Sequence, residues 1–361
     1  MEKVFSMNAG DGDSSYAQNS SFLQKNVLLK AKPSLEESIR SWETTFECDT
    51  LCIADLGCSS GPNTLFVTQI ITSEIGEKYA HKGIRVPEFQ ILYNDLPSTD
   101  FNALFKLLLA APPAERSYLV AGVPGSFHNR LFPSRSLHFI HSSNSLHWLS
   151  RVPPEIEDKN SKCWNKGRIF ISEKGPPEVG DAYFAQYQKD FNMFLRARAK
   201  EVVEGGRMFL VFGSRPSADK RQYTWASFSW EDLGFAIKDL VSQGIIEEER
   251  LDSFNLPAYQ VSEDELRSEV HKEGSFTIVG LEIIIGSSSM DKYDDNEKGK
   301  LFSKQMRAVL ESLISYHFGE KVVDAIFNRY AEIFTANIIQ NEEYMKQATR
   351  IAVTLERNDS T

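Results

Sequence analysis

The sequence of 361 residues predicts an α/β fold built on a mostly parallel sheet. Apolar runs of strand length alternate with amphipathic stretches of helix length, which is the pattern of repeated strand–helix–strand units. The first run, residues 51–56, leads through a glycine-rich turn into a helix start, and this arrangement favours a nucleotide-like ligand. The second run leads to Asp95, where an acid can meet the ribose hydroxyls of such a ligand.

Each element follows from its local pattern. A helix is expected before residue 46, and the helix after the glycine turn is expected to be capped by Asn63 or Thr64. Gly205 and Gly206 are expected to end the long helix at 180–203. The strands are expected at 51–56, 89–93, 117–123, 137–142, 207–212, 275–285 and 348–356, with further helices within 225–270 and 301–340.

Composition places the chain among globular proteins and narrows its partners. It is 41% hydrophobic and 25% charged, with a net charge of −10 and a pI near 5.4. The absence of a basic patch argues against a nucleic-acid partner, and no apolar stretch is long enough to span a membrane. The first residues do not read as a signal peptide, so we expect a cytoplasmic protein. The four cysteines form no C-x-x-C pair, and no zinc site is expected.

The glycine turn by itself leaves three interpretations open. Its Asp-Leu-Gly-Cys-Ser-Ser-Gly pattern is typical of a turn that binds S-adenosylmethionine. Through Gly57, Ser59 and Gly61 it also fits the G-x-S-x-G elbow of a serine esterase. The third interpretation is a tight turn without a ligand. His138 and His141 fall on opposite faces of their strand, which argues against a metal site shared with His128 and His147.

Several motifs together resemble those of the plant SABATH methyltransferases, which methylate salicylate, benzoate, jasmonate, indole-acetate and xanthine alkaloids. The resemblance runs over nearly the whole chain. Each motif is weak alone, and the set is specific. The motifs lie at residues 15–20 (Ser-Tyr-Ala-Gln-Asn-Ser), 55–64, 94–96, 122–127, 141–143, 146–150 (Leu-His-Trp-Leu-Ser), 165–167 and 252–257.

The resemblance implies a class I methyltransferase fold, which is a Rossmann-like, seven-stranded, mostly parallel sheet with an α-helical cap. It also implies a homodimer. We expect residues 1–224 to form the S-adenosylmethionine-binding core, with a gating segment at the start that carries Tyr16. Residues 225–270 and 287–345 are expected to form the cap, and 271–286 and 346–361 to close the sheet.

Three sets of site residues follow from the turn and the resemblance. S-adenosylmethionine is expected at Tyr16, Asp55, Gly57, Cys58, Asn63, Asp95, Leu96, Ser126 and Phe127. The acceptor is expected at Gln24, Asn144, His147, Trp148, Trp230, Met306 and Val309. In some family members a magnesium ion sits beside the positions that match Asn165, Asp252, Phe254 and Asn255.

The expected reaction is methyl ester formation on a small hydrophobic carboxylic acid. A carboxylate is already ionised in the cell, so no general base is needed, and Trp148 offers one N–H donor to hold it. Two positions depart from many carboxyl methylators: Leu23, beside Gln24, replaces a glutamine, and Asn144 replaces an aromatic ring. The alternatives are N-methylation of a xanthine, a non-catalytic S-adenosylmethionine-binding protein and the serine esterase.

Overall fold

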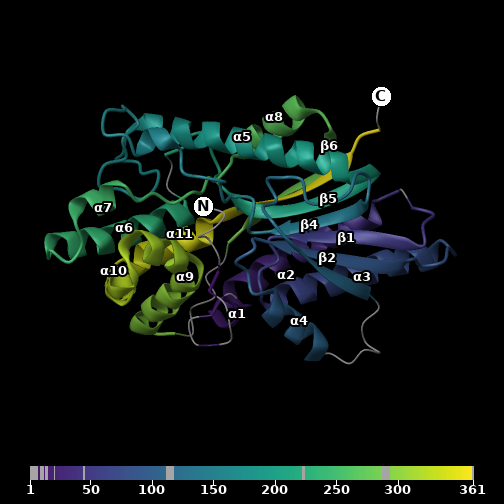
Figure 1. The fold of residues 1–361 in the computed structure, drawn as a ribbon, viewed down its shortest axis with the longest axis horizontal. Helices are drawn as coiled ribbons and strands as arrows, with labels where there is room; N and C mark the ends of the chain where they lie inside the picture. Colours follow the sequence, from purple (N-terminus) through teal and green to yellow (C-terminus); the bar gives the residue numbers. More distant parts are fainter. Residues whose placement is uncertain are drawn as a thin grey trace.

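The computed structural model describes residues 7, 8, 12, 15–19, 21–43, 45–110, 118–221, 224–286 and 293–359. The side chains of residues 17, 21–25 and 225 are outside this description. A twisted sheet occupies one end of the molecule and a group of helices the other (Figure 1).

The sheet has seven strands in the order β3-β2-β1-β4-β5-β7-β6. The first five strands pair in parallel, and β7 runs antiparallel to β5 and β6. The predicted seven-stranded, mostly parallel sheet is therefore confirmed. The strands are β1 (Thr50–Leu56), β2 (Glu88–Asp95), β3 (Tyr118–Pro124), β4 (Leu137–Ser143), β5 (Val202–Ser214), β6 (Phe276–Ile285) and β7 (Thr349–Arg357).

Helices cover both faces of the sheet because successive strand residues point to opposite sides. In β1, Ile53 packs into the core under α2, α3 and α4, whereas Ala54 packs into the core under α5. Figure 1 shows α5 and α8 along one face and α2, α3 and α4 along the other. These helices are α2 (Ser21–Arg40), α3 (Pro62–His81), α4 (Phe101–Ala110), α5 (Pro177–Glu201) and α8 (Glu263–Glu273).

A second group of helices forms the end of the molecule opposite the open sheet (Figure 1). There α10 packs against α9 and α6, and α11 against α6. The short α1 (Tyr16–Asn19) contacts α9, whereas α8 packs on α5 and β6. The division of the chain at residues 224, 270, 286 and 345 stays a prediction. The group comprises α6 (Trp225–Ser242), α7 (Glu248–Asp252), α9 (Asp295–Phe318), α10 (Val323–Ala336) and α11 (Ile338–Gln347), with 3-10 turns at Pro154–Ile156 and Glu320–Val322.

Some predicted boundaries were wrong for local reasons. Helix α3 has Gly61 at its N-cap position, without a side-chain cap, and Pro62 in its first turn, where proline fixes the helical φ and needs no N–H partner. Helix α5 ends at Glu201, and Gly205 and Gly206 lie inside β5. A Cβ on Gly206 would be 3.0 Å from the His138 carbonyl oxygen of β4, so the glycine serves strand packing.

Two further boundaries differ. Helix α2 ends at Arg40, short of the expected residue 46. Helix α9 begins at Asp295, before the expected start at residue 301, because Asp294 and Glu297 form a capping box. Helix α4 was not predicted at all, although its apolar residues Leu104 and Leu108 recur at helical spacing and are buried.

The close approach of α9 to α10 yields a stability prediction. A Cβ on Gly299 would lie 2.0 Å from Thr335 Oγ1 and 2.8 Å from the Ala331 carbonyl oxygen. Gly299→Ala should therefore lower the free energy of unfolding by about 1–3 kcal/mol, as overpacking does. The matched control is Gly76→Ala in α3, where the nearest atom, Val86 Cγ1, is 3.9 Å away.

The free energy of unfolding of the Gly76→Ala control should stay the same or rise by up to about 1 kcal/mol, because alanine favours helix more than glycine does. Urea denaturation of both variants measures the difference. Equal stability of the two variants would show that the helices can separate without cost.

Candidate donor and acceptor site

The glycine turn after β1 is held by the end of β2. The backbone N–H groups of Gly57 and Cys58 both donate to the Asn94 carbonyl oxygen, at 2.9 and 3.0 Å. Gly57 has φ +74°, and a Cβ there would lie 2.1 Å from Ser145 Oγ. Only glycine fits this position, since both the conformation and the contact exclude a side chain.

The Asn94–Asp95 pair ties three loops into one cavity edge. Asn94 Nδ2 donates to the carbonyl oxygens of Val123 and Gly125 at the end of β3. Asp95 Oδ2 accepts from the Ser59 N–H at 2.7 Å. Its Oδ1 accepts from the Leu96 N–H at 2.7 Å and from the Thr99 hydroxyl at 2.9 Å. Burial raises the pKa of the Asp95 carboxyl, while these hydrogen bonds favour its ionised form.

A first cavity, the turn cavity, lies along these loops. It contains six of the nine residues predicted to bind S-adenosylmethionine, and these come from α1, the glycine turn and the loops after β2 and β3. The turn cavity is lined by Met7, Tyr16, Gly57, Ser59, Asp95, Leu96, Ser126, Phe127, His128, Ser143, Asn144, Ser145, Trp148, Leu149 and Ser150.

The other three predicted residues do not line the turn cavity. Asp55 is buried, where Oδ1 is 2.7 Å from His141 Nδ1 and Oδ2 accepts from the Thr64 hydroxyl. Cys58 is buried, and burial raises the pKa of its thiol well above the ordinary value. Asn63 is partly buried in the first turn of α3. Asp55 therefore braces the turn from behind, and a direct ligand contact of these residues stays a prediction.

A buried ion pair on α5 shapes the far side of the turn cavity. Arg198 Nε is 2.7 Å from Glu201 Oε2, and both side chains are fully buried. The two terminal nitrogens of Arg198 donate to the carbonyl oxygens of Phe127 and Asn129, each at 2.9 Å. Glu201 Oε1 accepts from the N–H groups of Leu131 and Phe132. Sequence reasoning missed this pair because its partners lie about 70 positions away.

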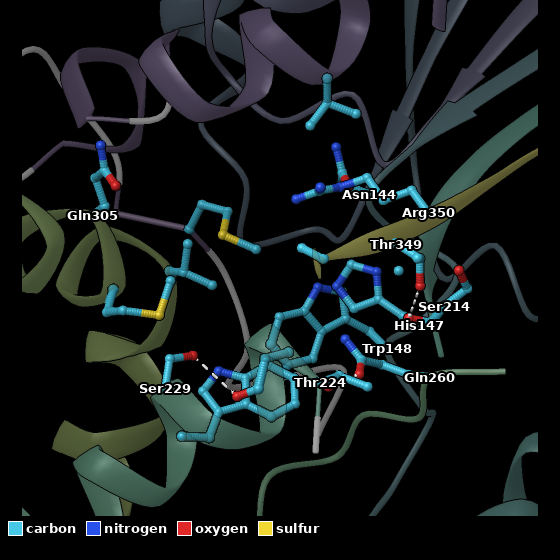
Figure 2. A pocket seen from close by; sticks show the side chains of 18 of the residues that line it. Asn144, His147, Trp148, Ser214, Thr224, Ser229, Gln260, Gln305, Thr349 and Arg350 are labelled. Carbon is cyan, nitrogen blue, oxygen red and sulfur yellow. Dashed lines mark hydrogen bonds between the residues drawn. The ribbon is translucent and has the colours of Figure 1, made fainter. Parts of the chain in front are cut away.

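A second cavity, the cap cavity, lies between the sheet edge and the helical group (Figure 2). All described residues of the predicted acceptor set line it, and the Gln24 and Leu23 side chains lie outside the described residues. The cap cavity is lined by Met7, Tyr16, Asn19, Val27, Asn144, His147, Trp148, Gly213, Ser214, Thr224, Ala226, Ser229, Trp230, Gln260, Gln305, Met306, Val309, Ala348, Thr349 and Arg350.

Four residues line both cavities and so mark their junction: Met7, Tyr16, Asn144 and Trp148. Trp148 is fixed by a bridge to Ala258 and by the ring of Trp230, whose centroid is 6.2 Å away. Asn144 has φ +54°, a conformation that asparagine tolerates better than most residues. A group held in the cap cavity therefore meets a group in the turn cavity beside Trp148 and Asn144.

Electrostatics within the cap cavity are unusual. Burial, together with the charge of Arg350, lowers the pKa of His147 to about 3, so its imidazole is neutral in the cell. Burial lowers the pKa of Arg350 to about 10, and this guanidinium remains charged at neutral pH. Its Nε donates to Asn144 Oδ1 at 3.2 Å. Arg350 was not predicted, because one arginine at the start of a strand carries no sequence signal by itself.

Comparison with known proteins agrees with this geometry. A sequence profile described as SAM dependent carboxyl methyltransferase matches residues 2–358. The chain belongs to this family. The methyltransferase is 41% identical to a 3,7-dimethylxanthine N-methyltransferase of Camellia sinensis var. assamica over 99% of this chain and 97% of that protein. It is 42% identical to a probable jasmonic acid carboxyl methyltransferase of Theobroma cacao over 92% and 93%.

A solved structure supports the fold of the methyltransferase over its full length. It is described as loganic acid methyltransferase with SAH, and it matches with a TM-score of 0.91 and 38% identity. The match covers 98% of this chain and 99% of that one. The predictions of an S-adenosylmethionine-dependent methyltransferase of this family and of its class I fold are confirmed.

The surroundings of Ser59 and His141 argue against the serine esterase alternative. Ser59 Oγ is buried and has no hydrogen-bond partner among the described residues of the methyltransferase. His141, on the adjacent strand β4, is engaged with Asp55. The G-x-S-x-G spacing therefore reflects the glycine turn of the methyltransferase family, without a nucleophile.

The residues predicted to hold magnesium lie outside both cavities. Asn165 Nδ2 donates to Asn255 Oδ1 at 2.8 Å, and Asp252 Oδ1 accepts from the Gly167 N–H at 2.9 Å. Asn165 Oδ1 is buried and has no hydrogen-bond partner among the described residues, so it and the second oxygen of Asp252 suit a hard cation. The Phe254 ring packs against Phe318, which leaves only its backbone carbonyl for an ion.

Within the described ranges, no group of three or more His, Cys, Asp or Glu side chains is placed to hold a metal ion. His138 Nδ1 accepts from the Cys52 N–H, and His141 bonds to Asp55. Every helix there is too short or too polar for a membrane span.

The Arg198–Glu201 pair gives a prediction for the methyltransferase. Arg198→Met should lower the free energy of unfolding by about 3–5 kcal/mol, because it leaves Glu201 buried without its cation. Adding Glu201→Gln should recover part of this loss, since a glutamine oxygen can still accept from Leu131 and Phe132 without a charge. Urea denaturation of both variants tests the order. A single variant as stable as the double variant would contradict the role of the pair.

Proposed function

We propose that the protein transfers the methyl group of S-adenosylmethionine to the carboxylate of a small, largely apolar acid and forms its methyl ester. One observation carries the proposal: the described lining of the cap cavity contains no side chain that takes up a proton at neutral pH. Its described lining residues include no aspartate or glutamate, and burial together with the charge of Arg350 lowers the pKa of His147 to about 3. An acceptor that needs no deprotonation suits such a cavity, and a carboxylate is that acceptor.

The donor would occupy the turn cavity. In this arrangement the fixed Asp95 carboxylate accepts from the ribose hydroxyls, and the backbone of the Gly57 turn lies against the amino-acid part of the donor. Phe127 and Leu96 line the same cavity and offer apolar surface to the adenine ring. Six of the residues predicted to bind S-adenosylmethionine line the turn cavity, and in this proposal they contact that one ligand.

The transfer itself needs positioning more than acid–base chemistry. A carboxylate oxygen attacks the methyl carbon in line, the carbon–sulfur bond breaks, and its electron pair stays on sulfur. The sulfonium becomes a neutral thioether and the carboxylate a neutral ester, so no proton moves. The protein must hold oxygen and methyl carbon roughly 3–3.5 Å apart. Trp148, at the junction of the cavities, is rigid and offers an indole N–H to the carboxylate.

The cap cavity combines apolar and polar walls. Trp230, Met306 and Val309 offer apolar contact, whereas Gln260 and Gln305 offer amide groups. Asn144, where many carboxyl methylators carry an aromatic ring, leaves room at the junction. These features support an acceptor bulkier or more polar than salicylate, of the jasmonate, indole or terpenoid type.

Magnesium would have no part in the transfer. Asn165 and Asp252 would hold the ion through oxygen atoms, together with a carbonyl of residues 254–255. Bound there, the ion would supply positive charge that holds the loop at Asn165 against the loop at residues 252–255. A homodimer stays a prediction from the family resemblance.

N-methylation of a xanthine is the second candidate. It is favoured by the 40–41% identity to Camellia xanthine methyltransferases over nearly the whole chain. A xanthine nitrogen that accepts a methyl group must lose its proton, and the described lining of the cap cavity offers no base for it. The neutral glutamine and serine groups would be the contacts of a xanthine ring.

A panel of acceptors separates the two candidates. Salicylate, benzoate, jasmonate, indole-acetate, loganate and xanthines are incubated with methyl-labelled S-adenosylmethionine. We expect label on one or more acids, released as methanol by mild alkali, because esters hydrolyse there and N-methyl groups do not. Base-stable label on a xanthine, with every acid inert, would replace the carboxylate proposal with the second candidate.

Removal of the indole donor tests the role of Trp148. Trp148→Phe should lower kcat/KM for the best acid roughly ten- to a hundredfold, because one hydrogen bond to a charged group is lost. The affinity for S-adenosylhomocysteine, measured by calorimetry, should not change. Trp164→Phe is the matched control, since that ring lies outside both cavities. Unchanged turnover in Trp148→Phe would remove Trp148 as the carboxylate donor.

A further inference from the structure

The described lining of the cap cavity carries a single formal charge. Among its lining residues in the part of the chain that the structure describes, Arg350 is the one charged side chain, and none is acidic. His147 beside it is neutral. Elsewhere in the described residues, the buried arginines Arg198, Arg207 and Arg215 have carboxylate partners, whereas Arg357, which is partly buried as Arg350 is, bonds to backbone carbonyl oxygens. Arg350 forms no such ion pair within the described ranges.

Within the described residues, the fold holds the Arg350 guanidinium at its Nε atom and leaves its two terminal nitrogens available. In β7 its backbone pairs with Gly213 of β5 on one side and with Ile284 of β6 on the other. Its Nε donates to Asn144 Oδ1, and within the described residues neither terminal nitrogen forms a hydrogen bond. A guanidinium with two free amino groups presents the donor pattern that matches the two oxygens of a carboxylate.

The contact with Asn144 places this group near the reacting atoms. Asn144 lines both cavities, so it stands where a donor methyl group and an acceptor would meet. Figure 2 shows Asn144 and Arg350 next to each other on one wall of the cap cavity. The hydrogen bond holds the Arg350 Nε toward this junction while the terminal nitrogens remain available to a ligand.

We propose that Arg350, oriented by Asn144, binds the carboxylate of the acceptor that is to be methylated, and so selects anionic acceptors over neutral ones. The inference rests on the proposed carboxyl methylation. One carboxylate oxygen accepts from the guanidinium, and the carboxylate presents an electron pair to the methyl carbon of the donor. Trp148, which lines both cavities, restrains the same carboxylate.

The same contact also favours product release. Before transfer, the acceptor is an anion held by a cation in a cavity of low polarity. When the new carbon–oxygen bond forms and the carbon–sulfur bond breaks, the acceptor becomes a neutral ester. The guanidinium then loses its ionic partner, so the ester binds more weakly than the acid.

The first test uses the unaltered protein and needs no variant. The S-adenosylhomocysteine complex is titrated by calorimetry with the most active acid of the panel and with its primary amide, a neutral group of the same shape. If no acid reacts, benzoate and jasmonate with their amides are used. We expect the acid to bind roughly 10- to 100-fold more tightly than the amide, the range of a charged hydrogen bond. Equal binding overturns the proposal.

The second test removes the charge. Arg350→Met should raise the dissociation constant and the KM of the acid roughly 10- to 100-fold and leave amide binding unchanged. Arg350→Lys should retain part of the preference, since it keeps the charge without the planar fork. S-adenosylhomocysteine affinity should stay constant in both variants. The matched control is Arg267→Met, whose side chain is about half exposed on α8 and pairs with Glu263.

The outcomes separate this inference from the proposed function. If the protein forms esters and Arg350→Met keeps the acid preference, the inference is wrong and the function stands. If no ester forms but acids bind to the unaltered protein and not to Arg350→Met, Arg350 is the anion-binding residue and the function is wrong. If acids and amides bind equally to both proteins, the inference is wrong whatever the reaction.

Discussion

The close contact between Gly57 and Ser145 is the constraint on which the site depends. The glycine turn can approach the loop after β4 only because Gly57 has no side chain. The same turn is held to the end of β2 by the two hydrogen bonds to Asn94, which also ties in the end of β3. Three parallel strands therefore present their carboxyl ends as one edge, and the loop that carries His147 and Trp148 starts from that edge.

The proposed chemistry follows from the lack of a base in the described lining of the cap cavity. A base would be needed to take a proton from a neutral acceptor, and the described lining provides none. What it provides is an indole and, among the described residues, one cation without a carboxylate partner, and we propose that these two groups orient an anion. The donor sulfonium supplies the driving force, so the protein contributes to the rate mainly through position and electrostatic environment.

The two cavities are built from different parts of the chain. The turn cavity lies at the sheet edge and is braced from behind by Asp55 and by the Arg198–Glu201 pair. The cap cavity takes its walls from α6, α9 and the start of β7. In the proposed arrangement, variation in these helical walls would change the acceptor without disturbing the donor. The chain has similar identity to relatives named as a xanthine N-methyltransferase and as a probable jasmonic acid carboxyl methyltransferase.

The sequence by itself determined the strand–helix alternation, the glycine turn, Asp95 and the His147–Trp148 segment, because each is encoded by residues close together in the chain. The tertiary structure alone decided which of these share a cavity. It also decided the contact of Arg350 with Asn144, which lies 206 positions away in the chain. The two meet because β4, β5 and β7 are neighbours in the sheet. Pairing between distant strands is set by burial and hydrogen bonding of the whole sheet, and local patterns do not contain it.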